Sequence, residues 1–107
     1  MKRYCALAAL FVLAGCSSGT PVPNVPDLNG KCDEVASFDM AFSRFDEAAQ
    51  EIAHGSGCFV QTNTAATGSI KPNPVKGEMT RREAVQASIQ ATGLKITNHQ
   101  PDQVTVE

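Results

Sequence analysis

The chain has 107 residues, 19% of them charged, and a formal net charge of −2 at pH 7. This length allows one small domain and a tail. Basic residues are spread thinly, and Arg81-Arg82 is the only adjacent basic pair beyond Lys2-Arg3. The sequence therefore lacks the clustered basic residues of a nucleic-acid-binding face, and we expect no nucleic-acid partner.

The N-terminus has the pattern of an export signal. Lys2-Arg3 precedes an almost wholly apolar run over residues 4–14. This run has signal-peptide length and is shorter than the roughly 20 residues that a membrane-spanning helix needs. It ends in Leu13-Ala14-Gly15-Cys16, which resembles the bacterial lipobox, where cleavage precedes the Cys and its sulfur receives a diacylglycerol. We expect residues 1–15 to be removed and Cys16 to be lipidated; an ordinary secretory signal with a chance Cys is the alternative.

The positions of the four cysteines predict different roles for them. Cys5 leaves with the signal and Cys16 takes the lipid, so Cys32 and Cys58 remain. An even pair in an exported protein predicts a disulfide bond. Pairing of either thiol with another chain is the alternative.

Residues 16–34 are expected to form a lipidated, Pro-rich tether. Their prolines and glycines oppose a helix and favour an extended, partly polyproline II chain. Val22, Val25 and Leu28 recur every three residues, which is the period of that helix. They are therefore candidates for a docking peptide.

The folded domain is expected over residues 35–107, and its first half predicts a strand, a helix and a strand. Residues 35–42 suit the first strand, and Ser43 suits an N-cap. Gly55 and Gly57 suit the helix end, and Cys58 begins the second strand. The helix is predicted from an apolar stripe of period 3.6, made of Phe45, Ala48, Ala49, Ile52 and Ala53.

The second half begins with a stretch over residues 63–77 that reads as a loop. Short edge-strand pieces are expected there at residues 69–71 and 75–76, because Pro is tolerated only at edges or bulges. Thr80 and Glu83 then form a capping box for the second helix. Its apolar stripe is made of Ala84, Val85, Ser88, Ile89 and Thr92.

Residues 94–98 and 104–106 alternate in polarity and predict a terminal hairpin. The last strand, with Val104 and Val106, is the second candidate contact surface. The two helices echo each other at an offset of 36, with Ser/Thr-Gly at the end of each. We therefore predict an α+β fold of two βαβ-like units, with two helices packed on small mixed sheets.

Residues 35–107 resemble the secretin/TonB-receptor short N-terminal domain. Phe38-Asp39-Met40-Ala41 is similar to its opening strand, which typically reads Phe-Asp-Ile-Pro-Ala. Two positions depart from the pattern, because Ala41 replaces Pro and Ser88 replaces Leu. The second half matches the family's Leu-Thr-Pro-Glu-Glu-Ala-Leu…Gly-Thr-Gly-Leu pattern at Thr80, Glu83, Ala84, Val85, Thr92, Gly93 and Leu94.

The resemblance implies protein docking, without catalysis or a cofactor. Lone lipoproteins of this kind resemble accessory parts of secretion or conjugation machines, including type IV cores, so envelope proteins of such a complex are the expected partners. Ser17 after the lipidated Cys implies the periplasmic face of the outer membrane. The alternative is an envelope module that binds a small ligand or glycan. The lack of Trp argues against a sugar platform.

The cysteines and histidines are the residues that could suggest a catalytic or metal site. His54 and Cys58 lack the strand-to-helix elbow of a nucleophile, because a helix ends there. Together with Cys32 and His99 they fit no closed Cys/His zinc spacing. We therefore expect neither an enzyme nor a metal site.

Overall fold

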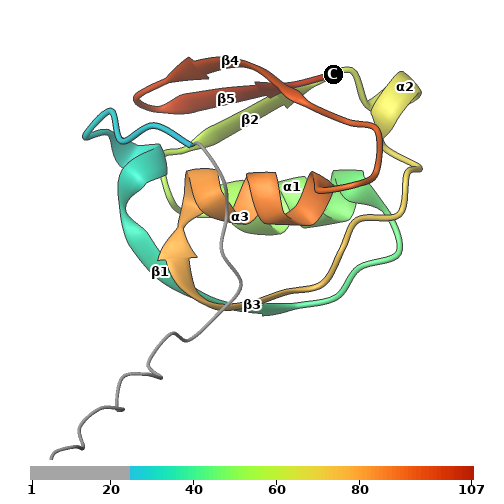
Figure 1. Cartoon of the computed structure of the whole chain (residues 1–107), viewed down its shortest axis with the longest axis horizontal. Helices are drawn as coiled ribbons and strands as arrows, with labels where there is room; N and C mark the ends of the chain where they lie inside the picture. The colour runs from blue at the N-terminus through green and yellow to red at the C-terminus, as the bar shows by residue number, and fades with distance from the viewer. Residues whose placement is uncertain (1–24) are drawn as a thin grey trace, which may run out of the picture.

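A computed structural model of the chain describes residues 25–107 and has three layers. Helices α1 (Phe45–Ala53) and α3 (Arg81–Ile89) lie side by side in the middle layer (Figure 1). The antiparallel pair β1 (Val35–Met40) and β3 (Val75–Thr80) covers one side of them. No helix within the described residues is long and apolar enough to cross a membrane.

A three-stranded sheet covers the other side of the helices. Its strands are β2 (Phe59–Thr62), β5 (Gln103–Val106) and β4 (Ile96–Gln100), in the order β2-β5-β4. The β2–β5 pair is parallel, and the β4–β5 pair is the expected terminal hairpin. This arrangement confirms the predicted α+β class with two helices on small sheets.

The predicted internal repeat is visible in the helix bounds. Both ends of α3 lie 36 residues after the corresponding ends of α1. Each half is a strand, a helix and a strand, but its two strands join different sheets, with β1 and β3 in one and β2 and β4 in the other. The halves therefore interlock, and neither half has a sheet of its own.

The core lies between the layers and is made of small and medium side chains. Phe45, Ile52, Val85 and Ile89 project from the helices and are at most 1% exposed. Alanines at 48, 49 and 84 allow the helices and sheets to approach closely. The helical stripes predicted from the sequence are therefore the buried faces.

The start of α1 differs from the prediction. Ser43 was the expected cap, but Arg44 holds the N-cap position and gives no side-chain cap. The first free amides of the helix, on Phe45 and Asp46, donate to the carbonyls of Ile70 and Gly68 at 2.8 and 3.2 Å. A distant loop thus satisfies the helix end that a local side chain was expected to satisfy.

The segment expected to be a loop is more ordered than predicted. Its first residues form the short helix α2 (Thr64–Thr67), where the Asn63 side chain accepts from the Ala65 amide. Residues 69–71 form no strand, but β3 runs from Val75 through Thr80, beyond the expected 75–76. The Thr80–Glu83 capping box is present as predicted, with bonds of 2.8 and 3.0 Å.

The folded part begins before Val35. Residues 31–33 form the short 3₁₀ helix η3 (Lys31–Asp33), with Cys32 fully buried. The Cys32 amide donates to the Pro101 carbonyl at 3.0 Å, in the turn of the β4–β5 hairpin. A Cβ on Gly30 would come within 2.1 Å of that same carbonyl oxygen, so only glycine fits there. The end of the expected tether is therefore part of the domain.

A disulfide bond joins Cys32 to Cys58, as the cysteine count led us to expect. Their Cα atoms are 4.8 Å apart, and both side chains are at most 1% exposed. The bond connects η3 to the residue that precedes β2. It therefore closes a loop that contains β1 and α1.

We predict that Cys32→Ala combined with Cys58→Ala lowers the free energy of unfolding by about 3.5 kcal/mol, because the loop closed by the bond no longer restricts the unfolded chain. Urea unfolding of the oxidised protein and of the double variant measures the difference. Oxidised wild type that gives free thiols at both positions by mass spectrometry would contradict the pairing.

Candidate functional site

The terminal strand was a predicted contact surface, and that prediction is wrong. Val104 and Val106 are fully buried, with their side chains in the core. β5 is also the central strand, with β2 on one side and β4 on the other. The side chains of Val104 and Val106 and the backbone edges of β5 are therefore not free to receive a partner.

The structure describes only part of the predicted tether and its candidate docking residues. Cys16 and Val22 lie outside the described residues. Val25 is half-buried and Leu28 is 37% exposed. The Leu28 amide donates to the Asp33 carboxylate at 3.1 Å, so this end of the tether follows the domain surface.

Within the three-stranded sheet, the free edge at β2 is a more regular template for an added strand than the edge at β4. The Phe59 amide donates to the Asp102 carbonyl at 2.9 Å, which fixes the side of β2 that faces β5. In a parallel pair, alternate residues direct both backbone groups to the same side, so those of Val60 and Thr62 point away from β5. The opposite edge, on β4, has a register shift between Ile96 and Asn98. Such an irregularity makes an edge a poor template.

A groove runs beside this edge, between β2 and α1. It encloses about 380 Å³. Ala49 and Ala53 line it from the helix, and Gln50 separates it from a second depression. Phe59, at the start of β2, borders the groove, and its side chain, on the face of the strand opposite to buried Val60, is 53% exposed. An apolar floor, an exposed aromatic ring and free backbone groups therefore lie together at one place.

The helix beside the groove carries acidic residues on its outer surface. Glu47 and Glu51 line the second depression with Phe42 and His54. Neither glutamate forms an ion pair within residues 25–107. Asp46 is different, because Arg44 contacts it at 2.9 Å. That contact lowers the pKa of Asp46 through the side-chain hydrogen bond and raises the pKa of Arg44.

A buried ion pair that the sequence alone does not reveal holds η3 against α3. The Arg82 guanidinium donates to both Asp33 carboxylate oxygens at 2.8 and 2.9 Å, and to the Gln100 carbonyl at 2.7 Å. Arg82 and Asp33 expose 0% and 3% of their side chains. The sequence did carry a sign of this burial. Arg82 stands three residues before Val85, so the helical period places it on the same buried face of α3.

The environment of this pair shifts two pKa values. The hydrogen bonds from Arg82 lower the pKa of Asp33. The His99 ring nitrogen lies 3.1 Å from the Arg82 guanidinium. Burial, together with the positive charge of Arg82, lowers the pKa of His99. The neutral imidazole is therefore the form that fits the folded protein.

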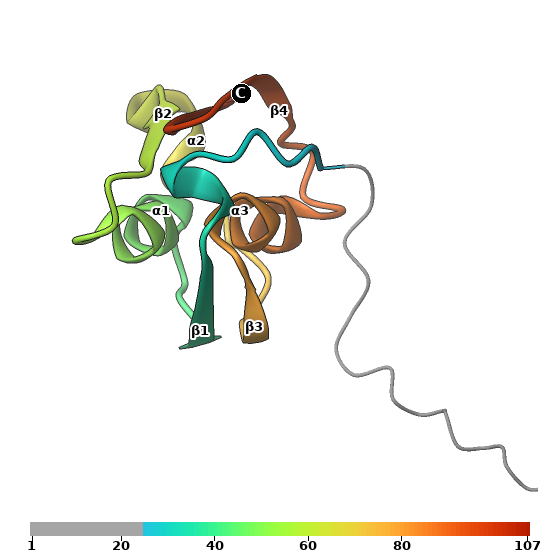
Figure 2. The ribbon, with the colours of Figure 1, turned by 90° about the vertical axis from the view of Figure 1, so that its left-hand side faces the viewer.

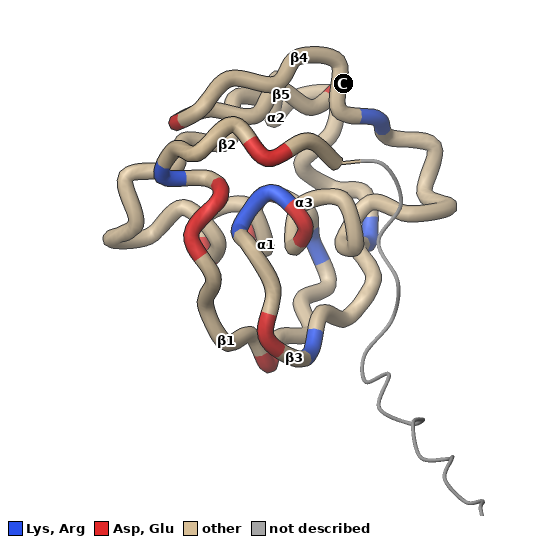
Figure 3. The backbone as a smooth tube through the Cα atoms, turned by 60° about the vertical axis from the view of Figure 1, so that its left-hand side comes forward, with Lys and Arg blue, Asp and Glu red and all other residues tan. Residues whose placement is uncertain are grey.

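Groups of metal-ligating or acidic side chains offer no further site in the described part of the chain. No set of three or more His, Cys, Asp and Glu residues there is placed to hold a metal ion. Cys58 is bonded to Cys32 and is not available beside His54. In Figure 3, basic and acidic positions are interspersed along the backbone rather than gathered by sign on one side.

The comparisons with known proteins support the fold alone. No family model matches the sequence, and no match is found among the curated proteins. The crystal structure of the ferripyoverdine receptor of the outer membrane of Pseudomonas aeruginosa, bound to ferripyoverdine, matches with a TM-score of 0.54 and 15% identity. The match covers 67% of this chain and 10% of the receptor. The described fold therefore resembles a small part of an outer-membrane receptor, which is compatible with the predicted short N-terminal domain.

We predict that Arg82→Met lowers the free energy of unfolding by about 3–5 kcal/mol, because it leaves the Asp33 carboxylate buried without its partner. The matched control is the adjacent Arg81→Met. Its side chain pairs at the surface with Glu34 at 4.0 Å, so a loss below about 1 kcal/mol is expected. Equal losses in urea unfolding would contradict a special role for Arg82.

We also predict that stability falls as the pH decreases below about 6.5, the ordinary histidine pKa. The unfolded chain then binds a proton at His99 that the folded protein resists, because its pKa there is lowered. The loss continues down to the native pKa of His99. His99→Gln should flatten this part of the stability curve, measured by urea unfolding at several pH values. A variant curve parallel to that of the wild type would refute the assignment.

Proposed function

We propose that this chain is a protein-docking module of the cell envelope, lipid-anchored at the periplasmic face of the outer membrane, and that a partner adds an extended segment to the free edge of β2. The observation that carries the proposal is the combination of free backbone groups at Val60 and Thr62 with the exposed ring of Phe59. The fold likeness to part of an outer-membrane receptor supports an envelope role.

The physical basis of docking at this edge is strand addition. Main-chain hydrogen bonds hold the added segment, and side-chain positions give specificity, so no deep pocket is needed. Phe59 would contribute about 1 kcal/mol if its exposed half became covered. The groove along α1 would receive side chains of the added strand that point toward the helices.

The lipid anchor limits where such docking takes place. Val25, where the described structure begins, is nine positions after Cys16, and nine steps of fully extended chain span at most about 32 Å. Lipidation at Cys16 would therefore keep the domain near the membrane surface. Envelope proteins of a secretion or conjugation complex are the partners that the family resemblance favours.

We predict that a photo-crosslinking amino acid at Gln61, an exposed position on β2, captures a distinct protein in intact envelopes. The same substitution at Lys76, exposed on β3, should not. Gel shift and mass spectrometry identify the product.

Cys16→Ser should remove the protein from the membrane fraction and strongly reduce this crosslink, because the anchor no longer concentrates the domain. Crosslinking at Lys76 without crosslinking at Gln61 would contradict docking at β2. A Cys16→Ser variant that still fractionates as a processed lipoprotein would contradict the anchor.

A further inference from the structure

The acidic surface of α1 allows the partner of the β2 edge to be described chemically. This inference rests on the proposed docking function. We infer that the segment added to β2 alternates basic and apolar residues, with the basic ones facing α1 and the apolar ones facing the side of Phe59.

The direction of the side chains on β2 sets this alternation. Val60 is buried and faces the helices, whereas Phe59 and Gln61 are exposed and face the opposite side. Side chains alternate between the two faces of a strand, so an added strand also sends every second side chain toward α1. The remaining side chains come to lie on the face that carries Phe59.

The surface of α1 determines which side chains of the added strand fit against it. Ala49 and Ala53 are small, so the side of the groove that they form is apolar and leaves room for a long side chain. Glu47 and Glu51 lie beyond Gln50, in the neighbouring depression. Lys and Arg match this pattern, because they place an apolar stem over such a surface and keep the charged end in water.

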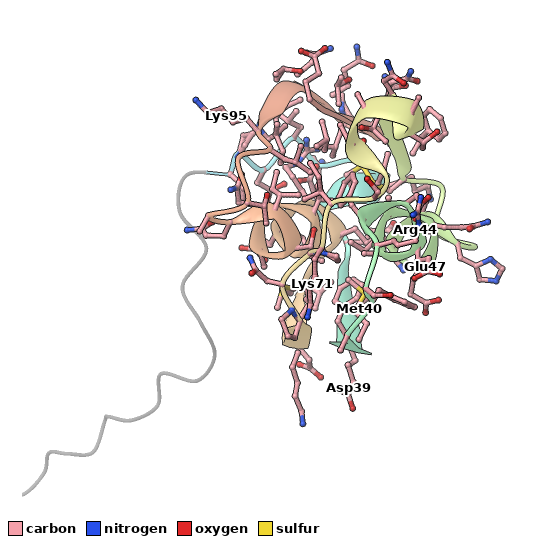
Figure 4. All side chains as sticks on the ribbon, turned by 90° about the vertical axis from the view of Figure 1, so that its right-hand side faces the viewer. Asp39, Met40, Arg44, Glu47, Lys71 and Lys95 are labelled. Carbon is pink, nitrogen blue, oxygen red and sulfur yellow. A yellow bond between two sulfur atoms is a disulfide. The ribbon has the colours of Figure 1, made fainter. Side chains whose placement is uncertain are left out.

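The local charge supports a cationic partner. Arg44 pairs with Asp46 and also lies close enough to Glu47 for that charge to raise the Arg44 pKa, but neither Glu47 nor Glu51 forms an ion pair within residues 25–107, so the acidic charges here outnumber the basic one. Figure 4 shows Arg44 and Glu47 on the same side of the molecule, with Asp39 well away at the far end of β1. A second copy of this chain, paired edge to edge at β2, would bring its own acidic helix to the same place and is disfavoured.

The first described residues of the chain lie away from α1 and β2. In Figure 2, the first described residues lie on the side of α3 and β4, whereas α1 and β2 lie on the opposite side. The groove is therefore not the place where the chain's own described N-terminal residues pack. A segment of another protein is the occupant that this arrangement fits.

The test uses the lipidated protein in mild detergent and three synthetic octapeptides as probes. The first alternates Lys and Val, the second alternates Glu and Val, and the third has the Lys and Val residues in two separate blocks. Fluorescence anisotropy measures binding. We expect the alternating Lys–Val peptide to bind at least about tenfold more tightly than either of the others, and to weaken as added salt screens the exposed charges.

Variants in the groove and matched control variants elsewhere test whether the peptide binds at this site. Glu47→Gln with Glu51→Gln should weaken binding of the Lys–Val peptide about fivefold, as two exposed ion pairs would. Phe59→Ser should also weaken it. Asp39→Asn with Glu78→Gln changes the net charge equally on the other sheet, and Val35→Ser removes another exposed apolar side chain. Neither control should change the affinity by more than about twofold, which is near the limit of such comparisons.

Two results overturn the inference. One is equal binding of the Glu–Val peptide, and the other is an equal loss in the Asp39–Glu78 control, which would indicate non-specific attraction. If no peptide binds while crosslinking at Gln61 persists in envelopes, docking at β2 stands and the basic character of the partner is wrong. If crosslinking at Gln61 is also absent, the docking proposal falls as well.

Discussion

The ion pair between Asp33 and Arg82 is the contact on which the arrangement of the domain depends. Two charges buried to this extent are tolerated only when their hydrogen-bonding capacity is used. Asp33 accepts from Arg82 and from the amides of Leu28 and Gly30, and Arg82 also reaches the Gln100 carbonyl. The pair therefore requires η3, α3 and β4 to be in place together. A core rich in alanine and valine gives little of this directional information.

The disulfide bond acts on the same segment from the other side. Cys32 lies next to Asp33, so neighbouring residues of η3 are connected to β2 through sulfur and to α3 through charge. The Lys31 amide also donates to the Asp102 side chain at 2.8 Å, in the β4–β5 turn. With η3 fixed to both the hairpin and β2, β5 is enclosed as the central strand. The free edge at β2 is a consequence of this order.

The sequence predicted the local elements well because their signals are local. The period of the apolar residues gave both helices, and the Thr80–Glu83 spacing gave the start of α3. Alternation in residues 104–106 correctly predicted a half-buried strand, but a central strand and an edge strand can alternate in the same way. Strand order depends on distant pairing, and for that reason Val104 and Val106 were wrongly assigned to a contact surface.

The residues that the sequence did not reveal share a physical feature, because each depends on a neighbour far along the chain. Arg82 reads as a solvated charge until Asp33, 49 residues earlier, is placed beside it. Phe59 reads as part of an apolar strand until the neighbouring layers show that its face is open. Both are fixed by the same segment, since η3 holds Arg82 inside and connects to β2 through Cys58. The first described residues lie on the side of α3 and β4, whereas α1 and β2 lie on the opposite side (Figure 2). By connecting α3, the hairpin and β2, η3 therefore determines where the buried ion pair and the free edge of β2 lie in this small domain.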